Sequence, residues 1–260
     1  MTGPDGNAAP PAPSVKPLSR RTARSMPLLV AGGLVLVLLL LAVVWHNNSG
    51  HPTTQATNVQ YAAANVSIVE LDGINGSLTV DVSTSSQISV TAQPVDGHKA
   101  PTLAFRLNAG THVITLICSD SNDGTAATCP ASTYTVLVPG HVGVTLHEVS
   151  GQAVLDGLSG PVSITASSAD TSVQGLRTAD FTAAITSGTL NASFATPPTH
   201  VSVSVISAQA SLRFPANATY DVRQRSVSAD IQINIPQAST STHTVQVSAT
   251  SGEIDLATSS

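Results

Sequence analysis

Histidine and carboxylate side chains are the groups of this sequence that could bind a metal ion or transfer protons. The histidines are His46, His51, His98, His112, His141, His147, His200 and His243. His141 and His147 lie in one extended segment, where six residues span about 20 Å, too far for one metal ion. We therefore expect surface histidines in contact with water.

Four aspartates follow or flank short turns: Asp156, Asp170, Asp180 and Asp230. If these turns stacked, a ladder of acids could bind calcium, as in some repeat proteins. The Gly-Gly-x-Gly-x-Asp units of such proteins are absent, and aspartate favours turns for its own backbone hydrogen bonds. We expect no metal and no cofactor.

Three arginines, Arg213, Arg223 and Arg225, form the one basic cluster after residue 45. They could contact an anionic cell-wall polymer, although isolated arginines on an acidic domain are usually solvated. The stretch GLSGP is not a nucleophile elbow, which needs Gly-x-Ser-x-Gly before a helix. We expect no catalytic residue and no enzyme; a wall-polymer-processing enzyme would need clustered carboxylates.

The two cysteines, Cys118 and Cys129, flank the turn-rich stretch SDSNDGTAAT. The alternating segments THVITLI and STYTVLV on either side predict a hairpin with a long loop, closed by a disulfide. Two cysteines do not make a zinc site, which takes about four ligands. A structural disulfide here would stabilise the fold by roughly 2–3 kcal/mol.

An uncharged apolar segment covers residues 26–45, and its length of about 30 Å matches the hydrocarbon core of a bilayer. Four basic residues and one acid precede it, and the next lysine or arginine is Lys99. The positive-inside rule then predicts a single-pass membrane protein with a disordered cytoplasmic tail (1–25), a linker (46–58) and an extracellular domain (59–260). A cleaved signal peptide is the alternative, but the segment is long and lacks a nearby small-x-small site.

The net charge of −5 is unevenly distributed, because residues after 45 carry six basic and fourteen acidic side chains. An acidic domain lacks the basic surface of a nucleic-acid-binding protein. The partners that we expect are the membrane, a cell-envelope polymer or surface protein, and a second copy through an open end.

Apolar residues alternate with polar ones throughout residues 59–260, which predicts an all-β domain. Ser-Gly or Ser-Ala pairs begin at residues 150, 168, 187, 207, 228 and 251. A period of about twenty residues, with two short strands and two turns in each, favours a β-solenoid over a β-sandwich.

The segment from Tyr134 to Phe194, with its YTVLVP start and serial Ser-Gly units, resembles the bacterial putative-adhesin family, also called DUF4097. The closing SATSGEIDL (248–256) is similar to the same unit. Gln152, Pro161 and Thr189 replace the usual aspartate, and the insertion between Cys118 and Cys129 is not general in the family. The resemblance implies a β-rich surface domain of about residues 60–260 and no accepted catalytic residue.

These observations favour a non-catalytic module of the cell surface, an adhesin or an envelope interaction protein. The alternative is an envelope-stress sensor or regulator that signals through the single transmembrane helix. The absence of a folded motif in the 25-residue tail argues against the alternative.

Overall fold

The computed structural model describes residues 55–95, 99–119 and 129–259, and residues 54–260 form one compact unit. The all-β prediction is confirmed. The strands are β1 (Thr57–Ala62), β2 (Ile68–Ser83), β3 (Gln87–Pro94), β4 (Thr102–Asn108), β5 (Val113–Ser119), β6 (Ser132–Pro139), β7 (Gly143–Asp156), β8 (Val162–Leu176), β9 (Asp180–Phe194), β10 (His200–Phe214), β11 (Asp221–Ser226), β12 (Asp230–Asn234), β13 (Thr244–Ala249) and β14 (Glu253–Thr258). One short 3-10 helix covers Ala63–Asn65.

The expected tail (1–25), the apolar segment (26–45) and most of the expected linker lie outside the described residues. Within the described ranges, no helix is both long and apolar enough to cross a bilayer.

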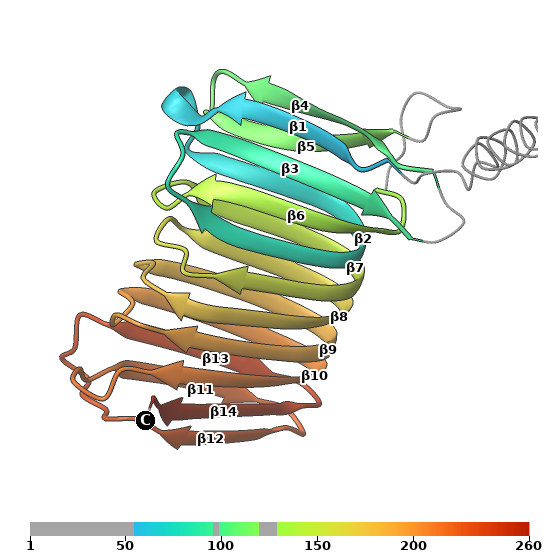
Figure 1. Ribbon diagram of the computed structural model, residues 1–260. Coiled ribbons are helices and arrows are strands. Elements are labelled where there is room, and N and C mark those ends of the chain that lie inside the picture. The colour runs from blue at the N-terminus through green and yellow to red at the C-terminus, as the bar shows by residue number, and fades with distance from the viewer. Residues whose placement is uncertain (1–54, 96–98, 120–128, 260) are drawn as a thin grey trace, which may run out of the picture. The chain divides into compact units, whose positions relative to one another are not determined.

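Five long strands, β2 and β7 to β10, form the middle of a stack and pair in parallel along both of their halves (Figure 1). The first halves belong to one layer, together with β4, β5, β13 and β11. The second halves belong to the other layer, together with β1, β3, β6, β14 and β12. Each long strand therefore contributes to both layers.

The Ser-Gly and Ser-Ala pairs that begin at residues 150, 168, 187 and 207 lie where the long strands bend from one layer into the other. In the register of the strands, Gly151 pairs with Ala169, Ala169 with Gly188, and Gly188 with Ala208. The prediction of a tight turn is wrong at these four pairs, because the strand continues through the bend, whereas the pairs at residues 228 and 251 lie between separate strands. Gly151 has a φ of 130° and Gly188 a φ of 109°, so the chain changes direction there without leaving the sheet.

The repeats do not stack in the order of the sequence at the end of the chain. Strands β13 and β14 lie between β10 and the pair β11 and β12, which form the edges of the two layers (Figure 1). The physical reason is burial. The inward residues of β13 and β14, such as Val245 and Ile254, are fully buried. Those of β12, Ile231 and Ile233, are only partly buried.

Cys118 and Cys129 form a disulfide with a Cα–Cα distance of 5.1 Å. The hairpin predicted around it is wrong: β5 pairs in parallel with the first half of β2, and β6 with its second half. The disulfide therefore lies beside the bend of β2. The amide of Cys129 donates a hydrogen bond of 2.8 Å to the carbonyl of Gly73 there.

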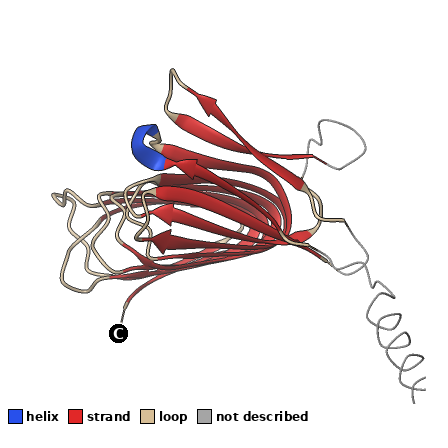
Figure 2. Cartoon of the chain, turned by 45° about the horizontal axis from the view of Figure 1, so that its top comes forward, coloured by secondary structure: helices blue, strands red, loops and turns tan. Residues whose placement is uncertain are grey.

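The core lies between the two layers and is built from the alternating residues that the sequence pattern identified. Val201, Val203 and Val205 of β10 are at most 2% exposed. The alternating residues that are not buried include Val82, which is 41% exposed, and the partly buried Ile231 and Ile233 of β12. At the opposite side of the molecule from the bends the chain forms loops (Figure 2), and there the rings of Phe181 and Phe194 meet across the core.

Candidate functional site

Parallel register places outward side chains of neighbouring strands side by side, so the surface of the first layer carries continuous polar rows. One row consists of Glu70, Thr145, Ser163, Thr182, Ser202, Gln246 and Arg223. The next row consists of Asp72, His147, Thr165, Ala184, Ser204, Ser248 and Arg225. Both rows end in an arginine on the edge strand β11.

Hydrogen bonds along these rows hold some of their members in place. The hydroxyl of Ser248 donates to that of Ser204 at 3.0 Å. At the other end of the stack, the hydroxyl of Thr115 donates to the Glu70 carboxylate at 2.8 Å. The rows therefore present fixed donors and acceptors on a rigid sheet.

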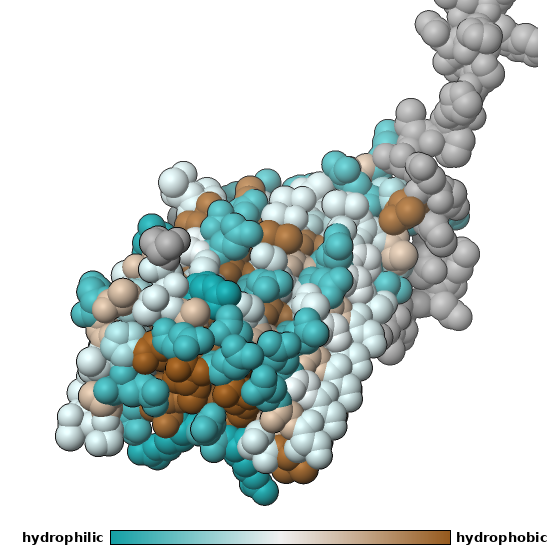
Figure 3. All heavy atoms as spheres, turned by 90° about the horizontal axis from the view of Figure 1, so that it is seen from below, coloured by the Kyte–Doolittle hydropathy of each residue, from teal (hydrophilic) through white to brown (hydrophobic). Residues whose placement is uncertain are grey.

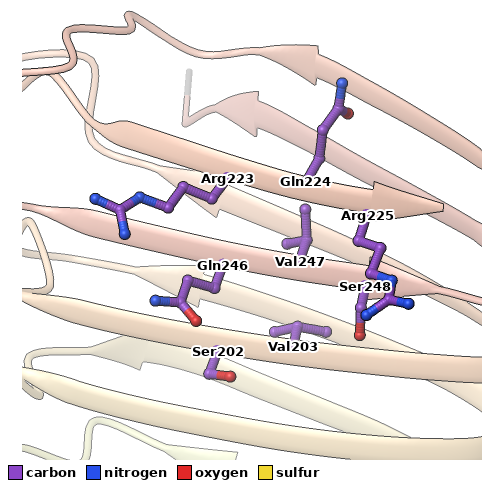
Figure 4. Close-up of a pocket in the computed structure, with 8 residues that line it drawn as sticks. All are labelled: Ser202, Val203, Arg223, Gln224, Arg225, Gln246, Val247 and Ser248. Carbon is purple, nitrogen blue, oxygen red and sulfur yellow. The ribbon is translucent and has the colours of Figure 1, made fainter.

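A shallow groove of about 360 Å³ lies where the two rows reach β11 (Figure 4). We call it the arginine groove, and it is lined by Ser202, Val203, Arg223, Gln224, Arg225, Gln246, Val247 and Ser248. Figure 4 shows Arg223, Gln246 and Ser202 in one row, with Arg225 beside Ser248 in the next. Val203 and Val247 are buried beneath the groove. Its surface therefore combines two guanidinium groups with amide and hydroxyl groups.

The two arginines differ in their partners. The Arg223 guanidinium donates to Asp221 at 2.9 Å, and its side chain is 67% exposed. Among the residues that the structure describes, Arg225 has no carboxylate within ion-pair distance. A guanidinium presents a planar set of donors that matches carboxylate and phosphate groups. Two such groups, about 6–7 Å apart on one strand face, fit an anionic chain better than a single small anion.

The prediction of one three-arginine cluster is wrong. Arg213 lies in the second half of β10, and therefore in the other layer. It donates to Asp255 at 2.7 Å, so its charge is already paired. The second layer is acidic around it, with Asp255, Asp230 and Glu253 in neighbouring positions of β12 and β14.

The four aspartates predicted at turns are dispersed. Asp180 begins β9 in the first layer, whereas Asp156 ends β7 in the second. Asp170 and Asp230 share one row of the second layer, but Thr189, Gln209 and Glu253 separate them. Asp170 accepts a hydrogen bond of 2.8 Å from Thr189. No group of three or more metal-ligating side chains occurs in residues 55–95, 99–119 and 129–259.

Three histidines take part in hydrogen bonds rather than only facing water. Nδ1 of His200 lies 2.8 Å from the Thr244 hydroxyl, and Nδ1 of His243 lies 2.8 Å from the Pro198 carbonyl. His112 contacts the Asn65 carbonyl at 3.1 Å. At these three positions the predicted surface histidines therefore also have hydrogen-bond partners within the protein. His46, His51 and His98 lie outside the described residues.

A column of aromatic rings beside the loops was not predicted from the sequence. It contains Phe181, Phe194, Phe214 and Tyr220, and His243 lies at its end. The signal was present, because Phe181, Phe194 and Phe214 each lie near the midpoint between two successive Ser-Gly or Ser-Ala pairs, where the long strands begin or end. Burial of Tyr220 raises the pKa of its hydroxyl to about 12. The column closes the core and offers no surface to a ligand, since these four rings are at most 3% exposed.

Comparison with solved structures gives low identities. A "putative adhesin" from Bacteroides fragilis is 12% identical, with 79% of this chain and 98% of that chain covered and a TM-score of 0.46. A "putative cell adhesion protein" from Clostridium sporogenes is 8% identical, with coverages of 79% and 100% and a TM-score of 0.43. A "putative lipid binding protein" from Parabacteroides distasonis is 10% identical, with coverages of 78% and 97% and a TM-score of 0.40.

No curated protein matches the chain. The model of the Toastrack DUF4097 family matches residues 144–260, which begin in β7 and include the bent strands β8 to β10 and the arginine groove. This match confirms the family resemblance noted in the sequence. Residues 144–260 are therefore similar to the Toastrack DUF4097 family.

Proposed function

We propose that this protein is a non-catalytic surface module that binds an anionic polymer of the cell envelope through the arginine groove. The observation that carries the proposal is that two polar rows of the first layer end at Arg223 and Arg225. A polymer laid across β10, β13 and β11 would meet a hydroxyl, an amide or a guanidinium on each of these strands. Affinity would then come from many modest contacts rather than from one pocket.

The polymer that this surface suits carries phosphate or carboxylate groups at regular intervals. The guanidinium group of arginine pairs with a phosphate or carboxylate group through two parallel hydrogen bonds. The groove is open, so each contact is partly screened and the binding should weaken as salt is added. The acidic second layer would repel the same polymer, which leaves the first layer as the binding face.

We infer a short β-solenoid whose coils are the bent strands, anchored in the membrane by residues 26–45 with residues 59–260 outside the cell. The uncharged segment preceded by basic residues supports this placement. A rigid stack attached to the membrane in this way would hold the arginine groove near the polymers of the envelope.

The experiment that tests the proposal is binding of residues 54–260 to immobilised wall polymers, with phosphate-rich, carboxylate-rich and neutral polymers side by side. We expect saturable binding to an anionic polymer and none to the neutral one. The variant Arg223→Gln/Arg225→Gln should lose most of the binding. The matched control is Arg213→Gln, which removes an arginine from the other layer and should leave binding unchanged.

Binding that survives the double substitution would overturn the arginine groove as the site. A folded protein that binds no polymer would overturn the function itself and favour the second candidate, a sensor that signals through its membrane segment. Capture of a cytoplasmic partner that depends on residues 1–25 would then be the next measurement.

A further inference from the structure

The end of the stack formed by β11 and β12 is an open end of the hydrophobic core. Figure 3 views the molecule from this end and shows an apolar area ringed by polar side chains. Val222, Ile231 and Ile233 pack against the core but remain partly exposed, and Val227 between the two strands is 56% exposed. The outermost layer of the core is therefore incompletely covered there.

The backbone at this end is also unpaired. Within the described chain, β11 pairs only with β13, and β12 pairs only with β14. The outer edge of each strand thus presents free N–H and C=O groups, which favour pairing with a further strand. The opposite end of the stack differs, because the rings of Tyr61 and Phe105 close it between β1 and β4 at a centroid distance of 6.0 Å.

We propose that this end face binds a second copy of the same chain, so that two stacks join end to end about a twofold axis. The two halves of β9 run in opposite directions, since its two ends meet at the Phe181–Phe194 contact. The halves of β8 and β10 pair in parallel with those of β9 and share these directions. A twofold axis along the strands exchanges the two layers. It therefore places β11 of one copy antiparallel to β12 of the other, and the reverse pair follows by symmetry.

Charge and side-chain direction select one register for this pairing. Val222 and Gln224 face inward on β11, as do Ile231 and Ile233 on β12. The register that overlaps the strands fully and matches inward with inward sets Val222 against Ile233 of the second copy. Arg225 then lies opposite Asp230 of the second copy, and Arg223 opposite its Gln232.

The end face is thus self-complementary in two respects. Apolar residues that are half-exposed in one copy cover those of the other, which removes their surface from water. The positive edge strand β11 meets the edge strand β12, which begins with an aspartate and carries no positive charge. A twofold operation makes each of these contacts twice. The inference does not rest on the proposed polymer binding, because Val222, Ile231 and Ile233 lie outside the arginine groove, although Arg223 and Arg225 belong to both surfaces.

The first experiment is cross-linking of the full-length chain purified in mild detergent. One preparation carries Arg223→Cys and the other Gln232→Cys. Opposed Cα atoms of an antiparallel pair lie about 4.5–5.5 Å apart, within disulfide range. We expect a disulfide-linked dimer when the two are mixed and oxidised, and little when either is oxidised alone. Equal cross-linking in the single preparations, or none in the mixture, would overturn the register.

The second experiment measures self-association of the full-length chain by analytical ultracentrifugation. We expect a dimer in the micromolar range and a dissociation constant raised about tenfold by Arg225→Asp. The double exchange Arg225→Asp/Asp230→Arg should restore the dimer, because it reverses the pair without losing it. A monomer at all concentrations, or no restoration, would overturn the proposal, while polymer binding measured separately would stand.

Discussion

The ring centroids of Phe181 and Phe194 lie 5.5 Å apart, although the two residues occupy the two ends of the same strand, β9. A flat strand of fifteen residues would separate them by about 45 Å. The contact exists because the strand bends at Ser187 and Gly188 and returns on itself. Strand β9 therefore buries its own two ends against each other, and Phe194 also stacks on Phe214 of β10 at 5.0 Å.

Replacing Phe194 by alanine should destabilise the fold strongly, because its ring contacts Phe181 of the same strand and Phe214 of β10. We expect Phe194→Ala to lower the free energy of unfolding by about 3–5 kcal/mol. Urea unfolding of residues 54–260, followed by far-ultraviolet circular dichroism, measures this change. The control is Ile206→Ala, whose side chain is 48% exposed and whose loss should change the stability by less than about 0.5 kcal/mol. Equal losses would contradict the closing role of the ring.

Gly188 cannot carry a side chain without moving its neighbour. A Cβ atom there would lie 2.1 Å from the carbonyl oxygen of Ala169, and the φ of 109° is strained for any residue but glycine. We expect Gly188→Ala to cost at least about 2 kcal/mol in the free energy of unfolding, measured by the same urea titration. Gly110→Ala is the control, because its Cβ would meet nothing nearer than 3.6 Å. A similar cost for both variants would show that the bend tolerates a side chain.

Alternation of small apolar residues predicted the strands and nearly all of the core, since a period of two leaves little choice of buried face. The Ser-Gly and Ser-Ala spacing also located the bends. It could not distinguish a bend from a turn, because the same residues serve both. The difference arises because Gly151 and Gly188 keep their strand pairing, here with Ala169 of β8. This pairing depends on the neighbouring strand and not on the local sequence.

The candidate site was only partly predictable for a related reason. Arg213, Arg223 and Arg225 are close in sequence, yet the bends place Arg213 in the other layer. Pairing of β10 with β13 rather than with β11 set the composition of the groove, because it brought Gln246 and Ser248 beside the arginines. Which strand pairs with β10 depends on how much apolar surface each candidate strand would bury. A local sequence pattern does not indicate that amount.

The disulfide between Cys118 and Cys129 should contribute to stability by limiting the unfolded chain. Its ends are 11 residues apart in sequence, for which loop closure predicts about 2–3 kcal/mol. We expect Cys118→Ala/Cys129→Ala to lower the free energy of unfolding by this amount. Wild-type protein unfolded in the presence of a reductant is the matched control and should show a similar loss. An unchanged midpoint in both would mean that the disulfide does not restrict the unfolded chain enough to affect stability.

The stability of the domain should fall between pH 10 and pH 12 because of Tyr220. Burial raises the pKa of its hydroxyl from 10.0 to about 12, while the hydroxyl donates a hydrogen bond of 3.0 Å to the Pro215 carbonyl. Above pH 10 the unfolded chain loses the phenolic proton and the folded chain keeps it, so unfolding becomes easier. The contribution is fully present below pH 10, and about 2 kcal/mol is lost as the pH rises through 12.

Unfolding midpoints of wild type and Tyr220→Phe, measured in steps from pH 9 to pH 12, test this dependence on Tyr220. We expect the variant to lose less stability over the interval, although some slope should remain because burial also raises the pKa of Tyr134. At pH 8 the variant lacks only the hydrogen bond to Pro215, so its stability should be lower than that of wild type by about 1 kcal/mol. Because wild type loses about 2 kcal/mol through Tyr220 as the pH rises through 12, the two stability curves should cross between pH 10 and pH 12. Parallel curves would mean that Tyr220 ionises as readily in the folded domain as in the unfolded chain.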